Sequence, residues 1–391
     1  MSRFLFVSLP LAGHVNPASA VAAALVADGH EVAWAGSELM LRPMLGRDAL
    51  ILPTGARLFR EQGGAGIASI RSLWSRFIVP YARFTLPGVD RAVRSFAPDV
   101  LVVDQHAVAG AIAAHRYGLP WATLVCSAME LTEPYRALPG ITRWTTDQLA
   151  GLWAGADLPA DEFFDLRYSP HLVIAATTPA LTGRAFGGRV RLVGPLIADR
   201  PATPFPFDRL DPTRRHVLVT MGTLADGLAA DFHVRAMAAL GTLSPTVQAI
   251  VVARPDDLPE PPDNVVVAER VPMLALLPHI DAVVGHGGVN TTSETLAAGI
   301  PLVLAPIRHD QPEMARLVVA AGAGVRVRFR RAGPTELAAA VAAVLDDPSY
   351  RVAAGRVAES FRAAGGARKA ARYAAGLQQT VSDPRRSLSG A

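Results

Sequence analysis

The chain has 391 residues, of which 50% are hydrophobic; it is long enough for two or three domains with cores of their own, and general disorder is excluded. Its single cysteine, Cys126, excludes a disulfide scaffold and any cysteine-rich zinc or iron–sulfur site. The net charge of +4 does not indicate a nucleic-acid partner, because Gly355–Ala391 carries seven basic and two acidic residues and leaves 31 basic against 32 acidic residues elsewhere.

The chain begins with an apolar run that a polar turn interrupts. Met1–Ala12 lacks a basic cluster, and Gly13-His14-Val15-Asn16-Pro17 follows before any cleavage site, so we do not expect a signal peptide here. No apolar stretch of about eighteen residues occurs anywhere in the sequence, so we expect no membrane-spanning helix. We therefore expect a soluble, cytoplasmic protein.

Continuous apolar runs alternate with helix-length segments through the first 200 residues. Such runs are typical of buried parallel strands. The expected strands are Phe4–Leu9, His30–Ala35, Asp99–Val103 and Trp121–Val125, and the expected helices are Ala18–Ala27 and Val108–His115. The alternation predicts a parallel sheet with helices on both faces.

Proline and charge mark a boundary within Ala198–Arg215, and we expect a linker over 201–213. After it the pattern restarts. The expected strands are His216–Thr220, Val247–Ala253, Val265–Ala268, Ala282–Val284 and Pro301–Ala305, and the helical segments are Leu228–Leu240, Thr292–Ala298 and Thr335–Gly376. The predicted fold class is α/β with two parallel-sheet domains, over 1–200 and 214–376, and a flexible tail over 377–391.

Common signatures of α/β enzymes are missing from the sequence. No Gly-x-Gly-x-x-Gly follows the first strand, and the only lysine, Lys369, does not form a P-loop. No Gly-x-Ser-x-Gly elbow, His-Glu-x-x-His motif or EF-hand loop occurs. A ligand cleft between two domains is then the default site.

The segment His286–Gln311 is the most informative. A strand ends at Val284, two glycines follow, and a helix begins near Asn290, so its amides and dipole can bind a diphosphate. The polar side chains suit a nucleotide sugar: His286 and Thr291 as donors, Glu294 for a ribose diol, and Asp310 and Gln311 for sugar hydroxyls.

These residues resemble the donor signature of the family-1 glycosyltransferases, the UDP-glycosyltransferase type. The signature is matched at His286, Gly288, Asn290, Thr291, Glu294, Gly299, Pro301, Pro306, Asp310 and Gln311. The resemblance implies the GT-B fold, in which an acceptor-binding and a nucleotide-sugar-binding Rossmann-like domain face each other across a cleft.

Two further segments extend the resemblance. Met221-Gly222-Thr223 is similar to the family's glycine turn near the donor phosphates, which implies that Gly222 and Thr223 bind the donor. The family usually has an aromatic residue before a Val-Pro pair, to stack on the base, whereas this chain has Arg270-Val271-Pro272. The Arg270 guanidinium can stack on a pyrimidine, or it is a solvated loop charge.

His14 follows the first strand in a Gly-His-x-x-Pro turn that also contains Gly13 and Pro17. A lone histidine is more often structural, but the resemblance implies that His14 is the base that activates the acceptor. Asp104 ends a strand and can simply cap a helix; the resemblance implies that it orients His14 and stabilises the imidazolium. We expect Gly13 and His106 to contact the acceptor; the alternative for His106 is an incidental position, which is more common for such a residue.

The resemblance implies sugar transfer with inversion, the diphosphate leaving toward the helix at Asn290 with help from His286 and Thr291. No cofactor or metal is expected, because protein groups meet the leaving-group charge and no matching carboxylate cluster exists. Gln311 favours a UDP-hexose over a dTDP-deoxysugar donor. Bacterial relatives imply a small lipophilic natural-product acceptor, held by the aromatic residues within 52–89 and 129–168. The oligomeric state, monomer or homodimer, stays open.

Two other functions stay open at this point. A UDP-sugar 2-epimerase or hydrolase on the same fold would consume the donor without any acceptor. A non-catalytic auxiliary protein that binds a glycosyltransferase would be expected to have lost His14 or the pair Glu294 and Asp310, and this chain keeps all three.

Overall fold

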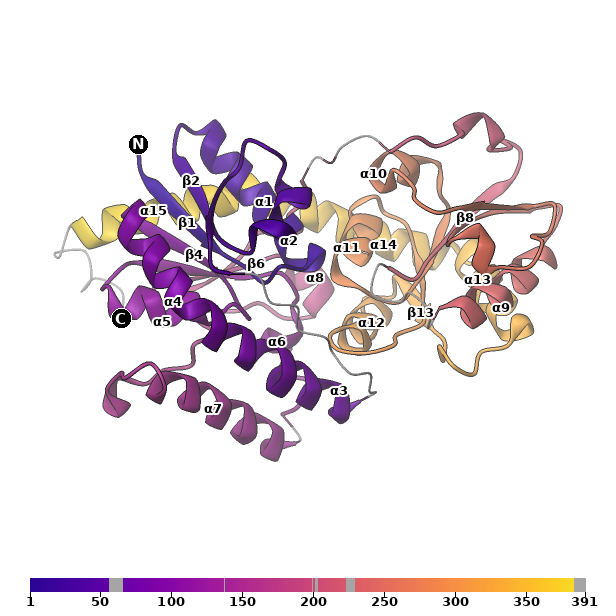
Figure 1. The fold of residues 1–391 in the computed structure, drawn as a ribbon. Coiled ribbons are helices and arrows are strands. Elements are labelled where there is room, and N and C mark those ends of the chain that lie inside the picture. Colours follow the sequence, from indigo (N-terminus) through magenta and orange to yellow (C-terminus); the bar gives the residue numbers. More distant parts are fainter. Residues whose placement is uncertain (56–65, 137, 199, 201–202, 223–228, 383–391) are drawn as a thin grey trace. The chain divides into compact units, whose positions relative to one another are not determined.

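The computed structural model describes residues 1–55, 66–136, 138–198, 200, 203–222 and 229–382. They form two compact units, each built on one parallel sheet (Figure 1). Unit 1 comprises Met1–Thr177, Ala185–Ala198 and Ala364–Ala391, and unit 2 comprises Thr178–Arg184 and Asp199–Ala363. None of the described helices is long and apolar enough to cross a membrane.

The sheet of unit 1 has seven parallel strands in the order β3-β2-β1-β4-β5-β6-β7. The strands are β1 (Arg3–Val7), β2 (Glu31–Gly36), β3 (Leu50–Pro53), β4 (Val100–Asp104), β5 (Trp121–Val125), β6 (Leu172–Ala175) and β7 (Val190–Leu192). In the central pair, Phe4 lies beside Val100 and Val7 beside Val103. Both faces of these strands are buried, which explains why the sequence shows continuous apolar runs here.

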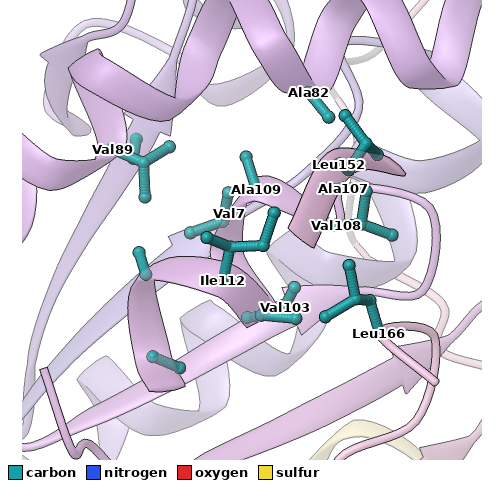
Figure 2. Close-up of a cluster of buried hydrophobic side chains, with 14 of the residues drawn as sticks. Val7, Ala82, Val89, Val103, Ala107, Val108, Ala109, Ile112, Leu152 and Leu166 are labelled. Carbon is teal, nitrogen blue, oxygen red and sulfur yellow. The ribbon is translucent and has the colours of Figure 1, made fainter. Parts of the chain in front are cut away.

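Helices cover both faces of this sheet. They are α1 (Ala12–Ala27), α2 (Glu38–Leu45), α3 (Ile67–Ser72), the π-helical η1 (Leu73–Ile78), α4 (Val79–Phe96), α5 (Ala109–Arg116), α6 (Met129–Thr132), α7 (Pro139–Ala154), η2 (Ala160–Glu162) and α15 (Gly366–Ser382). On one face Val7 and Val103 pack with Val89 of α4, Ile112 of α5 and Leu152 of α7 (Figure 2). Because side chains alternate along a strand, the residues between them point to the other face and pack against α1 and α15.

The sheet of unit 2 has six parallel strands in the order β10-β9-β8-β11-β12-β13. They are β8 (Arg215–Thr220), β9 (Val247–Val252), β10 (Val265–Ala268), β11 (Ala282–Gly285), β12 (Leu302–Leu304) and β13 (Gly324–Arg326). The helical segments are α8 (Pro179–Thr182), η3 (Phe207–Arg209), α9 (Ala230–Gly241), η5 (Pro255–Asp257), α10 (Met273–Leu276), η6 (Leu277–His279), α11 (Val289–Ala297), α12 (Gln311–Ala320), α13 (Pro334–Asp346) and α14 (Pro348–Ala364).

The predicted fold class, two parallel-sheet α/β domains, is confirmed, and every predicted strand overlaps an observed one. The first helix differs from the prediction, since it begins at Ala12 instead of Ala18. The amides of His14 and Val15 both bond to the carbonyl of Leu11, so the predicted glycine turn is already the first turn of α1.

The domain boundaries also differ from the predicted ones. Thr178–Arg184 belongs to unit 2, and α15 belongs to unit 1 and continues to Ser382, past the predicted start of a flexible tail at 377. The physical reason is an apolar stripe of α15, including Ala370, Ala374 and Leu377, that is buried in the core beside α1. Positions 383–391 of the predicted tail lie outside the described residues.

Candidate active site

The strand order places a crevice at the carboxyl edge of each sheet. In unit 1 the chain winds from β1 toward β2 and from β4 toward β5, so the loops that follow β1 and β4 diverge. In unit 2 the same divergence occurs after β8 and β11. Ligands of open α/β sheets bind at such switch points. His14 and Asp104 lie at the first switch point, and Gly222 and His286 lie at the second.

His14 and Asp104 form a hydrogen-bonded pair in unit 1. His14 Nδ1 lies 2.6 Å from Asp104 Oδ2, and the side chain of His14 is 21% exposed against 1% for that of Asp104. Burial alone would raise the pKa of Asp104. The charges of His14 and His106, and the hydrogen bonds that these two residues make to the carboxylate, hold this pKa below its usual value. Asp104 is therefore ionised at neutral pH and fixes the ring through Nδ1, which makes Nε2 the nitrogen that can take a proton.

His106 packs next to this pair. Its backbone amide donates to Asp104 Oδ1 at 2.8 Å, and its ring stands edge-on to His14 and to Trp74, with centroids 5.9 and 6.0 Å away. On the other side, His106 Nε2 lies 3.6 Å from Glu130 Oε1. The structure thus brings the predicted residue His106 next to His14 and Asp104, as a buried group with contacts on two sides.

Glu130, which was not predicted from the sequence, lies between His106 and Arg167. Burial would raise the pKa of Glu130, but His106 and the guanidinium of Arg167, whose Nη1 lies 2.6 Å from Oε2, lower it. Arg167 in turn binds the carboxylate of Asp165. A signal was available, because Glu130 follows the strand Trp121–Val125, and β5 neighbours β4 at the same sheet edge.

The other residues expected to hold the acceptor divide into two groups. A Cβ on Gly13 would meet no atom within 4 Å, so this site is open. Trp74 and Trp153, each 1% exposed, belong to the hydrophobic core, as do Phe77 and Tyr81. Burial and the charge of Asp104 raise the pKa of Tyr81. These aromatic side chains are core residues, and Phe59 lies outside the described residues.

In unit 2 the ring of His286 fills the space between two glycines. Gly222 follows β8 with φ +73°, and a Cβ there would lie 2.6 Å from His286 Cε1. A Cβ on Gly288 would overlap Nε2 of the same ring. Glycine at both positions therefore leaves room for this ring, and the predicted residues Gly222, His286 and Gly288 are brought together. Thr223 lies outside the described residues.

His286 is prepared to act as a neutral imidazole. The pKa of His286 is lowered, mainly by burial. The charge of Asp310 opposes this shift and the charge of Arg308 adds to it. The Nδ1 atom of His286 is buried and has no hydrogen-bond partner among the described residues. Such an orphaned nitrogen at the start of α11 suits a polar ligand.

The helix α11 carries three more predicted residues. Gly288 precedes the helix in extended conformation, and Asn290 and Thr291 lie in its first turn, where backbone amides have no helical acceptor. Glu294 lies in the second turn and is buried, and Arg200 Nη2 donates to its Oε1. Burial raises the pKa of Glu294, and the ion pair with Arg200 opposes that effect. Arg200 was not anticipated from the sequence.

Asp310 and Gln311 follow β12. Asp310 precedes α12, and His309 before it has φ +56°, a left-handed conformation that costs a non-glycine residue free energy and marks a constrained loop. The side-chain oxygen of Gln311 accepts from the amides of Ile307 and Arg308 at 2.9 and 3.0 Å. Gln311 thus holds this loop in shape, and its amide nitrogen is the atom suited to a sugar hydroxyl.

Arg270 and Val271 lie at the carboxyl end of β10, two strands from β8. The side chain of Arg270 is exposed, and Val271 packs against a small core that includes Leu276 and Ile280. Arg270 is thus an exposed loop residue after β10, a strand that does not border the switch point between β8 and β11.

One group among the described residues has the composition of a metal site. His14, Asp104 and His106 offer ligand atoms within 4.8 Å of one another. Two of these potential ligand atoms, His14 Nδ1 and Asp104 Oδ2, already bond to each other, and Asp104 Oδ1 accepts from a backbone amide. His14 and Asp104 are thus already bonded to each other, whereas His106 Nε2 faces Glu130 Oε1 at 3.6 Å.

Comparison with known proteins identifies the class. Residues 235–370 match the family described as Erythromycin biosynthesis protein CIII-like, C-terminal domain. The 4'-demethylrebeccamycin synthase of Lentzea aerocolonigenes is 29% identical over 93% of this chain and 96% of its own length. Demethyllactenocin mycarosyltransferase of Streptomyces fradiae is 28% identical over 96% of this chain and 87% of its own length. The chain is thus similar to glycosyltransferases of natural-product pathways, which supports the resemblance to family-1 glycosyltransferases.

A solved glycosyltransferase structure confirms the fold of this glycosyltransferase. The spinosyn rhamnosyltransferase SpnG, complexed with thymidine diphosphate, superimposes with a TM-score of 0.77 at 22% identity over 98% of this chain and 100% of its own. The predicted GT-B fold is confirmed, with its two parallel-sheet units of seven and six strands.

Proposed function

We propose that this glycosyltransferase moves a sugar from a nucleotide diphosphate sugar to a hydroxyl of a small lipophilic natural product, with inversion at the anomeric carbon. The observation that supports it most is the pair His14 and Asp104, a histidine 2.6 Å from a buried ionised carboxylate at the switch point of unit 1. A histidine oriented in this way is suited to general-base catalysis.

In the proposed step, His14 Nε2 takes the proton of the acceptor hydroxyl as its oxygen attacks the anomeric carbon. The bond from that carbon to the diphosphate oxygen breaks, and the electron pair leaves with the diphosphate. Asp104 stabilises the imidazolium that forms. The amides of the first turn of α11, with His286 and Thr291, meet the charge on the leaving group.

Because these groups neutralise the diphosphate, we propose that transfer needs neither a metal ion nor a cofactor. Relatives support the substrate classes: SpnG holds thymidine diphosphate, and the curated relatives are named as a natural-product synthase and a mycarosyltransferase. The predicted preference for a UDP-hexose over a dTDP-deoxysugar rests on Gln311. The amide oxygen of this residue already accepts hydrogen bonds from the backbone amides of Ile307 and Arg308, so it is not reserved for a sugar hydroxyl. Both donors therefore belong to the proposal.

The stereochemistry of the product tests the proposal. UDP-glucose or dTDP-glucose, both α-linked, is incubated with a set of lipophilic phenols such as 4-methylumbelliferone, and the anomeric coupling constant is measured by NMR. A single displacement gives the β-glucoside. An α-glucoside would contradict it, and donor consumption that does not depend on the acceptor would favour a hydrolase or epimerase.

A further inference from the structure

The surroundings of Glu294 carry an inference that rests on the proposed donor site. The Glu294 side chain is 3% exposed, whereas that of its partner Arg200 is 33% exposed. A buried carboxylate is costly unless it is paired, and burial indeed raises the pKa of Glu294 despite the guanidinium beside it. Arg200 Nη2 donates to one carboxylate oxygen, Oε1. The two residues belong to the same unit.

This contact changes what Glu294 can offer a nucleotide. A carboxylate binds the vicinal 2'- and 3'-hydroxyls of a ribose by accepting one hydrogen bond on each oxygen. Arg200 Nη2 takes one acceptor position of Oε1 and places its guanidinium beside that oxygen, so a sugar hydroxyl is hindered at Oε1 and Oε2 is the better acceptor. A ribose then buries one hydroxyl without its partner, which is costly, whereas a 2'-deoxyribose has no such hydroxyl to leave unpaired.

We propose that Arg200 is a specificity-determining residue that limits Glu294 to one ribose hydroxyl and so favours donors built on 2'-deoxyribose, such as dTDP-sugars, over UDP-sugars. Arg200 acts through Glu294 and takes no part in the chemical step. The proposal goes beyond the donor signature, because Arg200 lies 94 positions before Glu294 and outside that motif.

The test compares two ligands that differ only in the 2'-hydroxyl. UDP and 2'-deoxy-UDP are titrated into the full-length protein by calorimetry, so that neither the base nor the diphosphate changes. The unpaired hydroxyl predicts that 2'-deoxy-UDP binds about 5- to 150-fold more tightly than UDP. Equal affinities, or tighter binding of UDP, would overturn the role of Arg200. Absence of binding by either ligand, and by dTDP, would overturn the donor site itself and the inference with it.

Variants of Arg200 show whether this residue discriminates between the two nucleotides or only competes with both of them for Glu294. In Arg200→Ala, and in Arg200→Met, which keeps the apolar stem, Glu294 regains both oxygens and the ratio of the two dissociation constants falls toward one. Arg209→Ala, at an exposed arginine of η3, is the matched control for loss of one positive charge and should keep the wild-type ratio. If Arg200→Ala tightens both ligands equally, Arg200 only competes with the nucleotide and the proposal is wrong.

A double mutant shows whether Arg200 acts through Glu294. In the Glu294→Gln background, Arg200→Ala should leave the ratio of dissociation constants unchanged, because the carboxylate whose oxygen it restricts is gone. A change in that ratio of the same size as in the wild-type background would place Arg200 in direct contact with the nucleotide and contradict the proposal. Circular dichroism and thermal unfolding verify that each variant is folded.

Discussion

His14 Nδ1 lies 2.6 Å from Asp104 Oδ2, although the two residues are 90 positions apart in the chain. The contact forms because β1 and β4 are neighbours in the sheet, so the first turn of α1 and the last residue of β4 meet at the same edge. The buried carboxylate selects the ring nitrogen that carries the proton, and this arrangement is the basis of the proposed catalysis.

The substitution Asp104→Asn should lower kcat by about 10²- to 10⁴-fold, because an amide neither stabilises the imidazolium nor enforces the required tautomer. Affinity for UDP or dTDP should stay at the wild-type level, since Asp104 belongs to the other unit. Asp90→Asn, which removes a carboxylate paired with Arg116 in the same unit, is the control. An activity close to wild type in Asp104→Asn would argue against the role of Asp104.

Gly288→Ala should abolish detectable nucleotide binding, because the added Cβ overlaps the His286 ring and must displace it from the start of α11. Calorimetry with UDP and dTDP measures the effect. The control is Gly355→Ala in α14, where a Cβ meets no atom within 4 Å and helix propensity predicts a gain of about 0.5–1 kcal/mol in unfolding free energy. Unchanged affinity in Gly288→Ala would show that His286 does not contact the nucleotide.

Acid should destabilise the protein through buried histidines. Burial lowers the pKa of His233 and of His286 in the folded state below the value of about 6.5 expected in the unfolded chain. Between the lowered pKa and about pH 6.5 the unfolded state binds protons that the folded state does not, so the unfolding free energy falls as pH falls. Each such histidine contributes a slope of up to about 1.4 kcal/mol per pH unit.

Urea unfolding of wild type and of His233→Gln between pH 8 and pH 5.5 measures this effect. The variant should lose less stability over that interval than the wild type does, whatever its stability at pH 8. Identical changes in the two proteins would show that His233 does not titrate as its burial implies.

The single cysteine provides a probe of the same region. Cys126 Sγ is buried 3.9 Å from Asp104 Oδ2, and burial together with that charge raises the pKa of the thiol well above its usual value. The folded protein should therefore react with an aromatic disulfide reagent at pH 8 only as fast as it unfolds locally. Rapid stoichiometric labelling would mean that the Asp104 environment is open to solvent.

Chelation should leave the reaction unaffected. Dialysis against EDTA followed by assay in metal-free buffer should retain the full rate of transfer, because amides of α11, His286 and Thr291 are proposed to meet the diphosphate charge. Loss of activity on dialysis, with recovery on addition of Mg²⁺ or Mn²⁺, would show that the leaving group needs a cation.

The sheets and the residues at their carboxyl edges were predictable from sequence. Strands such as β4 and β8 are continuous apolar runs because both of their faces are buried, and residues that follow such runs gather at one edge. Hence His14, Asp104 and His286 were placed at the correct ends. Four strands of three or four residues, β3, β6, β7 and β13, were not predicted.

Side-chain partners from distant segments were not predictable. Arg200 and Glu130 are ordinary charged residues in the sequence, and only the folded chain sets one against Glu294 and the other against His106. The same holds for α15, whose helical pattern is clear. The alanine-rich stripe of α15 predicts a buried face, but it does not predict that this face packs beside α1 in unit 1.

The most direct test of the central claim is a comparison of His14→Ala with wild type in two measurements on the same preparation, sugar transfer and nucleotide affinity. The account predicts a loss of about 10²- to 10⁴-fold in transfer with unchanged affinity for UDP and dTDP, because His14 acts on the acceptor and lies in the unit that does not carry α11. His115→Ala, at a histidine paired with Glu162 in the same unit, controls for loss of an imidazole. Transfer at the wild-type rate in His14→Ala would contradict the account.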